Sequence, residues 1–300
     1  MYYEKLIKEL NENNTFDRCL SKIINPFSLY YLCDHYYGGK EVESENITFI
    51  LEDKNDLLKS NDLSKIKDFD IIHCQVDYFE KFCNEILHKI QKKFILTTGQ
   101  YNLPQIQKSK IIEKILNNEN VILWISQNPI YDNIGKYIAF PYGIRYDKLQ
   151  QYAYILINNS SLKKTKELLY LPVGITNECR KKLPMYSDYL NVSDFYKTVQ
   201  QGKFLISPIG DRDDCYRHYE AIGLGTIPIS NVNCFYKNIF KTNMIYADID
   251  EMVKIIEEGH VNYIYEEPNK DLICFEYYRD IVNKIIEKHK QLQDELVIFD

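Results

Sequence analysis

The sequence has no long run of basic residues and no long run of apolar residues. Its 37 lysines and arginines are outnumbered by 43 aspartates and glutamates, so the formal net charge is −6. This balance argues against a general nucleic-acid binder. The lack of a long apolar run argues against a signal peptide or a membrane span. We therefore expect no nucleic-acid partner and no transmembrane segment.

The cysteine spacing typical of zinc sites is also absent. None of the eight cysteines forms a C-x-x-C pair or a paired Cys/His spacing, so no structural zinc site is expected. The cysteines are scattered through apolar segments, which is typical of reduced, buried thiols. We expect a cytoplasmic protein.

Apolar residues make up 45% of the 300 residues, which is enough for a soluble chain with one large or two medium cores. Residues 1–24 have helical periodicity. Strands are expected at 46–53, 68–76, 92–100, 120–126 and 136–144. One helix of about 15 residues is expected from Asp77, and another is expected at 105–117. Several strands are apolar without strict alternation, which indicates a parallel α/β sheet.

A second α/β series follows a polar stretch at 145–165, which we interpret as a linker. Its strands are expected at 166–174, 203–210, 226–231 and 243–248. Its helices are expected at 193–201, from Asp213 or Asp214 to Gly225, from the end of the 243–248 strand to Glu258, and from 271 to about 295. The whole pattern predicts two Rossmann-like domains facing across a cleft. We place them at 1–155 and 166–270, with a C-terminal helix at 271–300.

The stretch GDRDDCYRHYEAIGLGTIPIS, residues 210–230, combines alternating charges with glycines after an expected strand. Unpaired N–H groups and the dipole at the start of the following helix would favour a phosphate. Gly210 would let the backbone approach it closely. Arg217 and Glu220 share a helix face, where a guanidinium suits a phosphate and a carboxylate suits ribose hydroxyls.

A structural interpretation of the same residues is also open. Arg217 and Glu220 can form an ordinary ion pair on the helix surface, worth a few tenths of a kcal/mol. Asp213 and Asp214 can be helix caps. Arg212 can be a solvated loop residue or a second phosphate contact.

Residues 203–230 contain the pattern F-x-x-S-P-x-G followed by D-x-x-R-x-x-E-A-x-x-x-G-x-x-P-I, which resembles the nucleotide-sugar motif of exostosin-like glycosyltransferases. The residues that fill it are Phe204, Ser207, Pro208, Gly210, Asp214, Arg217, Glu220, Ala221, Gly225, Pro228 and Ile229. Weaker similarity lies upstream, at Thr176, Asn177 and Arg180, and in 122–129 and 138–144. The resemblance covers roughly 92–250, and Gln100 stands where the family has an acid.

This resemblance implies a GT-B fold whose C-terminal helix returns toward the N-terminal domain. It implies inverting transfer of a hexosyl or pentosyl group from a UDP- or GDP-linked sugar donor to a glycan or other hydroxyl acceptor, with no required metal or other cofactor. The residues it assigns to the donor are Arg180, Ser207, Gly210, Asp214, Arg217 and Glu220, and we add Arg212 as a candidate second phosphate contact. It assigns Asn128 to the acceptor or sugar.

Inverting transfer needs a general base beside the acceptor hydroxyl. Candidates in the N-terminal half are His73, Asp77 and Asp34, the last with His35 beside a Gly-Gly loop. Each can equally be structural, and a lone histidine on a strand is typically packed.

Two other functions stay open. Asp211-x-Asp213 and Asp248-x-Asp250 match the D-x-D motif of metal-dependent GT-A transferases, because clustered carboxylates bind hard cations. A noncatalytic nucleotide-sugar or glycan-binding protein is the other alternative, and Gln100 favours it.

Overall fold

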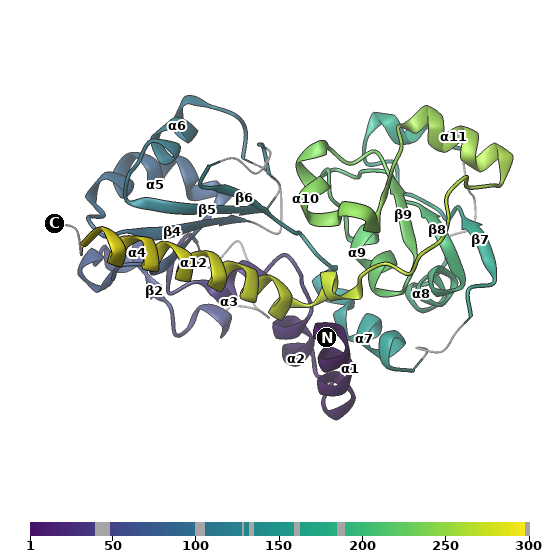
Figure 1. Cartoon of the computed structure of the whole chain (residues 1–300), viewed down its shortest axis with the longest axis horizontal. Helices are drawn as coiled ribbons and strands as arrows, with labels where there is room; N and C mark the ends of the chain where they lie inside the picture. Colours follow the sequence, from purple (N-terminus) through teal and green to yellow (C-terminus); the bar gives the residue numbers. More distant parts are fainter. Residues whose placement is uncertain are drawn as a thin grey trace. The chain divides into compact units, whose positions relative to one another are not determined.

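The structure is a computed structural model that describes residues 1–39, 49–99, 106–127, 129–131, 135–158, 163–184 and 190–297. The chain folds into two compact units. The larger-sheet unit is formed by Pro26–Phe140 and Glu276–Asp300, and the smaller-sheet unit by Met1–Asn25 and Pro141–Phe275. Each unit has a parallel sheet with helices, so the protein is of the Rossmann-like α/β class (Figure 1).

The larger sheet has six parallel strands in the order β2-β1-β3-β4-β5-β6. The strands are β1 His35–Tyr37, β2 Asn55–Asp56, β3 Ile71–Gln75, β4 Phe94–Gly99, β5 Val121–Gln127 and β6 Tyr137–Phe140. Every residue of β3 and β4 is buried. This burial explains their apolar runs without alternation, because both faces of the sheet are covered.

Helices cover the larger sheet. They are α3 Ser28–Leu32, α4 Leu57–Ser60, α5 Phe79–Glu85, α6 Lys110–Leu116 and α12 Phe275–Val297, with 3-10 turns at Leu63–Lys65, Val76–Tyr78 and Leu87–Lys89. In Figure 1, α5 and α6 lie on one side of β4–β6 and α12 runs along the other. The Phe79 ring of α5 stacks 5.7 Å from the Trp124 ring. Tyr278 of α12 lies 5.5 Å from Phe140, measured between ring centroids.

The smaller sheet has four parallel strands in the order β10-β9-β8-β7. They are β7 Lys166–Leu169, β8 Gly202–Ile206, β9 Ile227–Ser230 and β10 Ile245–Tyr246. The α-helices of this unit are α1 Tyr2–Glu12, α2 Phe16–Lys22, α7 Leu149–Asn158, α8 Val192–Gln201, α9 Tyr216–Gly223, α10 Lys237–Phe240 and α11 Ile249–Glu258. Its 3-10 turns are Tyr146–Lys148, Glu178–Lys182, Cys234–Tyr236, Lys241–Asn243 and Lys270–Ile273.

The core of the smaller-sheet unit lies between β8, β9 and α11. Phe204, Ile206 and Ile229 are fully buried in it, and burial of each contributes about 2 kcal/mol. Gly225, which follows α9, has φ +73°, a left-handed conformation that glycine adopts without a steric cost. The predicted end of this helix at Gly225 is therefore confirmed, and the chain turns there into β9.

Two expectations about the chain's organisation are wrong. The 145–165 stretch is not a linker, since its Leu149–Asn158 form α7 with five buried residues. Helices α1 and α2 pack against α7, so residues 1–25 and 141–155 belong with the C-terminal sheet rather than with an N-terminal domain of 1–155. The C-terminal helix does group with 26–140, through contacts such as Tyr278 to Phe140.

The strand expected at 46–53 is also wrong where the structure describes it. Phe49–Leu51 form a 3-10 turn, and β1 at His35–Tyr37 occupies that part of the sheet instead. The other expected strands are present, although β7 ends at Leu169, five residues before the expected end. The helix at 193–201 is confirmed within one residue, and the one at 105–117 begins only at Lys110. The helix of about 15 residues expected from Asp77 is shorter, since α5 spans Phe79–Glu85 between two 3-10 turns. In the part of the chain that the structure describes, no helix combines the length and the hydropathy needed to cross a bilayer.

Candidate functional site

The segment that joins β8 to α9 is held in place by backbone hydrogen bonds. The Ser207 N–H donates to the Ile229 carbonyl at 2.9 Å, which continues the β8–β9 pairing. The Ser207 carbonyl in turn accepts from Nε2 of His218 at 2.9 Å. The Ile209 N–H donates to Oδ1 of Asn231 at 3.0 Å. This segment is therefore fixed beyond the carboxyl end of the sheet, where open α/β sheets bind ligands.

Helix α9 begins at Tyr216 with Cys215 as its N-cap, not at Asp213 or Asp214 as expected. Nδ1 of His218 accepts from the Cys215 N–H at 3.2 Å. Asp214 cannot cap the helix because its Oδ2 accepts from the Tyr142 N–H at 2.9 Å and from the Tyr219 hydroxyl at 2.7 Å. Burial raises the pKa of Asp214, and these two hydrogen bonds oppose the rise.

The element at Asn177 and Arg180 anchors this segment from the other side. The Asn177 amide donates to the Ile209 carbonyl at 3.0 Å and to the Gly210 carbonyl at 2.5 Å. Arg180 donates to the carbonyls of Gly174 at 2.7 Å, Pro208 at 2.9 Å and Ile209 at 2.6 Å. These bonds use three of the five N–H donors of a guanidinium, so Arg180 keeps a positive charge and donors for a ligand.

Arg217 projects from the first turn of α9 and is half-buried. Its Nη2 donates to the Pro172 carbonyl at 2.6 Å, and its guanidinium lies 5.2 Å from the centre of the Phe195 ring. Burial lowers the pKa of Arg217, while Cys215 and Glu220 oppose the decrease. Among the ion pairs between described residues, none joins Arg217 to Glu220, so the expected surface pair is not formed.

Glu220, one turn further along α9, is buried, and its Oε1 accepts from the Tyr196 hydroxyl at 2.9 Å. Burial raises the pKa of Glu220, whereas the Tyr196 hydrogen bond and the charges of Arg217 and Arg145 oppose the rise. Glu220 is therefore an acceptor that is shielded from bulk water and borders on cations.

These side chains line one cavity of about 390 Å³, which we call the arginine cavity. Its lining residues are Arg145, Lys148, Gly174, Thr176, Arg180, Leu190, Val192, Phe195, Tyr196, Gly210, Asp211, Cys215, Tyr216, Arg217 and Glu220. A Cβ added to Gly210 would lie 3.4 Å from Nη2 of Arg180 and 3.6 Å from Oγ1 of Thr176, so Gly210 leaves room beside the cation. Four of the lining residues are cationic and two are acidic, which favours an anion.

Four of the seven residues expected to bind a donor line this cavity, namely Arg180, Gly210, Arg217 and Glu220. The other three, Ser207, Arg212 and Asp214, are buried outside the lining set. Arg212 is neither solvated nor in the cavity wall, because its guanidinium lies 4.4 Å from the centre of the Tyr142 ring. Ser207, Arg212 and Asp214 therefore shape the β8–α9 segment.

The sequence did not point to Arg145, Lys148, Phe195 and Tyr196 as parts of the site. Arg145 and Lys148 come from the stretch interpreted as a linker, and both pair with Asp147, at 2.6 Å and 3.6 Å. Phe195 and Tyr196 lie on α8, where helical periodicity indicated only packing. They are consecutive residues and therefore do not share one helix face, so helical spacing gave no signal for the pair.

The three candidate bases occupy different environments. His73 is fully buried in the middle of β3, with Nδ1 2.9 Å from Oγ1 of Thr97 and its ring 4.4 Å from that of Tyr30. Burial lowers the pKa of His73 to about 3. These are the surroundings of a neutral, packed histidine.

The two aspartates lie at opposite ends of the larger sheet. Asp34 precedes β1, and its Oδ2 accepts from the Ile71 N–H at 2.9 Å, so it lies at the amino end of the strands, away from the edge where ligands bind. Asp77 is exposed in the turn Val76–Tyr78 directly after β3, at the carboxyl end. His35 beside Asp34 is held by Asp70 at 2.8 Å. Asn128 and Gln100 lie outside the described residues.

The two D-x-D sequences have separate environments. Asp248 is the N-cap of α11, accepting from the Glu251 N–H at 2.8 Å, and Asp250 pairs with Lys182 at 3.1 Å. Asp211 is exposed in the cavity wall, and Asp213 is half-buried. Within the described ranges, no group of three or more His, Cys, Asp or Glu side chains is arranged to hold a metal ion.

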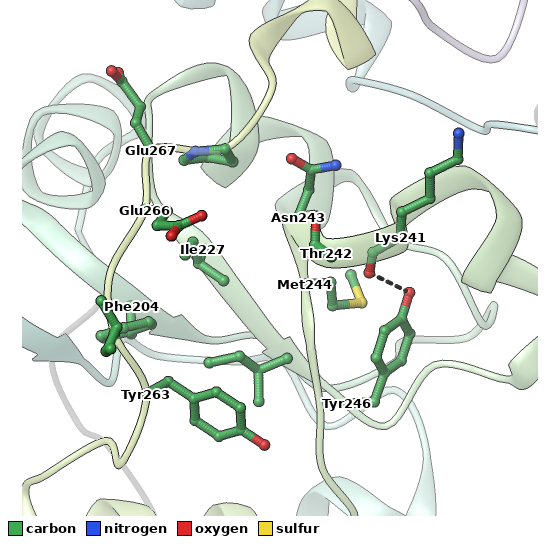
Figure 2. Close-up of a pocket in the computed structure, with 13 residues that line it drawn as sticks. Phe204, Ile227, Lys241, Thr242, Asn243, Met244, Tyr246, Tyr263, Glu266 and Glu267 are labelled. Atoms are coloured by element: carbon green, nitrogen blue, oxygen red, sulfur yellow. Dashed lines mark hydrogen bonds between the residues drawn. The ribbon is translucent and has the colours of Figure 1, made fainter.

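A second cavity of about 430 Å³ lies where β9 and β10 begin, the opposite end of the same sheet (Figure 2). Phe204, Ile227 and Ile245 contribute apolar side chains, and Glu266 and Glu267 add acidic groups. Glu267 pairs with Lys270 at 2.5 Å. This cavity lacks the arginines of the first and does not suit a phosphate.

Comparison with known proteins assigns no family. The sequence matches no protein-family model, and no curated protein matches it. The residues of the arginine cavity are therefore the basis for a functional proposal.

Proposed function

We propose that this protein is an inverting glycosyltransferase that moves a sugar from a UDP- or GDP-linked donor to a hydroxyl of a glycan or other acceptor. The observation that carries the proposal is that Arg180, Arg217 and Glu220 line one cavity beyond the carboxyl ends of β7 and β8. A pyrophosphate next to the two arginines and a ribose next to the carboxylate would use all three groups. A GT-B arrangement of the two units is part of the same proposal.

In the proposed transfer reaction, negative charge develops on the departing diphosphate. The acceptor oxygen attacks the anomeric carbon, the bond from that carbon to the β-phosphate oxygen breaks, and the electron pair stays on the departing diphosphate. A base takes the proton of the acceptor hydroxyl. Arg180 and Arg217 are already fixed by hydrogen bonds to carbonyls, so they stabilise the growing negative charge without reorganising.

This proposal needs no metal, because the two guanidinium groups and the N–H groups at the start of α9 supply the positive potential. Of the three candidate bases, Asp77 has the position that fits, after the carboxyl end of β3. A noncatalytic binding protein would keep the nucleotide site but lack the transfer step.

Calorimetric titration with UDP, GDP, dTDP and CMP tests the site. We expect one diphosphate to bind the wild type and Arg217→Ala to weaken it by about tenfold to a hundredfold, because a charge-assisted hydrogen bond is worth about 1.5–3 kcal/mol. The control is Arg279→Ala, which removes an arginine of α12 that pairs with Glu276 outside the cavity. Unchanged affinity in Arg217→Ala would show that the nucleotide binds elsewhere.

Transfer assays with the corresponding nucleotide sugars then separate the alternatives. Activity that survives a chelator excludes a metal-dependent transferase. Tight binding of a diphosphate with neither transfer nor donor hydrolysis identifies a binding protein instead.

A further inference from the structure

Two buried tyrosines converge on Glu220 from neighbouring helices. The Tyr196 hydroxyl on α8 donates to Oε1 of Glu220 at 2.9 Å. The Tyr152 hydroxyl on α7 donates to the Glu220 backbone carbonyl at 3.0 Å. The two rings meet edge to face, with centroids 5.1 Å apart and an interplanar angle of 74°. Both the carboxylate and the backbone of Glu220 are thus held by phenols.

The hydrogen bond from Tyr196 uses one carboxylate oxygen of Glu220, which is one of the residues that line the arginine cavity. No other described residue makes a hydrogen bond or ion pair with this carboxylate. A donor hydroxyl that holds Oε1 fixes the orientation of the whole planar carboxylate, so the second oxygen has a fixed direction.

We propose that Tyr196 is a positioning residue that holds Glu220 ionised and correctly oriented to accept hydrogen bonds from the ribose hydroxyls of the donor. This inference rests on the proposed function and adds a residue to which neither the motif nor the periodicity pointed. Tyr196 does not touch the reacting atoms, and it acts through Glu220.

The electrostatic surroundings of Glu220 make the role measurable. Burial raises the pKa of this carboxyl, while the Tyr196 hydrogen bond, Arg217 on the same helix and Arg145 ahead of α7 oppose the rise, and Asp147 adds to it. Loss of the phenol hydrogen bond therefore raises the pKa of Glu220 further. A protonated Glu220 is a poorer acceptor for two hydroxyls, so ligand affinity becomes dependent on pH.

The test is calorimetric titration with UDP and GDP from mildly acidic to mildly alkaline pH, using Tyr196→Phe. This variant keeps the ring and its packing against Tyr152 and removes only the hydroxyl. We expect about tenfold weaker binding at neutral pH, as for one hydrogen bond to a charged group. Affinity should recover as pH rises, with its midpoint at a higher pH than in the wild type.

Tyr152→Phe is the matched control, because it deletes the hydroxyl that contacts the backbone carbonyl rather than the carboxylate. We expect its pH midpoint to equal that of the wild type. In a Glu220→Gln background, Tyr196→Phe should no longer move the midpoint, since the titrating group is gone.

The outcomes separate the two proposals. If the wild type binds a diphosphate and Tyr196→Phe has the same affinity and the same midpoint, the role of Tyr196 is wrong and the proposed function stands. If the wild type binds no nucleotide at any pH, the proposed function falls and this inference falls with it.

Discussion

The carboxyl ends of the two parallel sheets differ in charge and in packing. In the smaller-sheet unit, Arg180 and Arg217 border a cavity and Gly210 leaves it open. In the larger-sheet unit, β3 and β5 end in neutral amides. Oε1 of Gln75 accepts from the Tyr36 hydroxyl and from the Gly39 N–H, both at 3.0 Å.

The layer of amide side chains at this end is also tightly filled. A Cβ added to Gly99 would lie 2.4 Å from Oε1 of Gln127, and one added to Gly38 would lie 2.6 Å from Oε1 of Gln75. Thr98 donates to Oγ of Ser126 at 3.1 Å in the same layer. The same strand geometry therefore supports two chemistries. A cationic, open end suits a polyanion, whereas the strand ends at Gln75 and Gln127 are occupied by amide side chains.

The largest expected effect is on stability in acid, and it comes from the neutral imidazole of His73 in the larger-sheet unit. Its pKa of about 3 lies below the unfolded value of 6.5, so the unfolded chain binds more protons between these two values. The free energy of unfolding therefore falls as pH falls through this window, by up to about 5 kcal/mol at its lower end. Urea unfolding followed by the fluorescence of Trp124, the one tryptophan of the sequence, measures this loss in the larger-sheet unit.

In His73→Gln the acid-dependent loss should largely disappear. The control is His88→Gln, which changes an exposed histidine of the same unit and should keep the wild-type slope. An equally steep slope in His73→Gln would mean that the acid sensitivity comes from other groups and that His73 is not held neutral.

The sequence allowed most of this fold to be predicted, because buried strands such as β3 and β4 begin with short apolar clusters, Ile71–Ile72 and Phe94–Leu96, that do not alternate with polar residues. The strand prediction missed β1, because His35, Tyr36 and Tyr37 have polar side-chain groups although all three residues are buried. The helix prediction also missed α7, where polar residues at both ends hid the apolar spacing of Leu149, Ala153 and Leu156.

The candidate site was predictable only at positions that a sequence motif covers, namely Arg180, Gly210, Arg217 and Glu220. Arg217 and Glu220 share one helix face, and their spacing together with the motif resemblance pointed to them. The burial of Arg212 depends on Tyr142, and the orientation of Glu220 depends on Tyr196. Such contacts between distant segments arise from tertiary packing, which periodicity does not encode.

A pair of glycine substitutions tests the difference in packing. Gly38→Ala should destabilise the larger-sheet unit by about 2 kcal/mol, because the new methyl overlaps Gln75 and the Tyr36 hydroxyl. Gly210→Ala should change stability by less than about 0.5 kcal/mol, since its methyl enters the cavity at ordinary contact distance. Urea unfolding of both variants, with titration of the bound diphosphate, measures the two effects.

The expected ligand effects are the reverse of the stability effects. Gly210→Ala should weaken diphosphate binding, because its methyl lies 3.4 Å from Nη2 of Arg180, where a phosphate oxygen would approach. If Gly210→Ala were the more destabilising of the two substitutions, the proposed contrast between an open and a filled end would be reversed.

The smallest expected effect belongs to Lys164, a half-buried cation of the smaller-sheet unit outside the arginine cavity. Its Nζ donates to the Leu224 carbonyl and to Oγ1 of Thr226, both at 2.9 Å, and burial lowers its pKa from 10.5 to about 7. The unfolded chain binds more protons between these values, so the free energy of unfolding rises as pH rises through this window. We expect a gain of about 1 kcal/mol, since partial exposure screens the charge.

Thermal unfolding by circular dichroism measures the gain as the difference between the wild type and Lys164→Met, which removes the titrating group. Lys163→Met is the matched control, because it changes an exposed lysine next in sequence and should follow the wild-type profile. His73 then makes the larger-sheet unit sensitive to acid, and Lys164 makes the smaller-sheet unit more stable in mild alkali. Identical profiles for Lys164→Met and the wild type would show that burial does not suppress this charge.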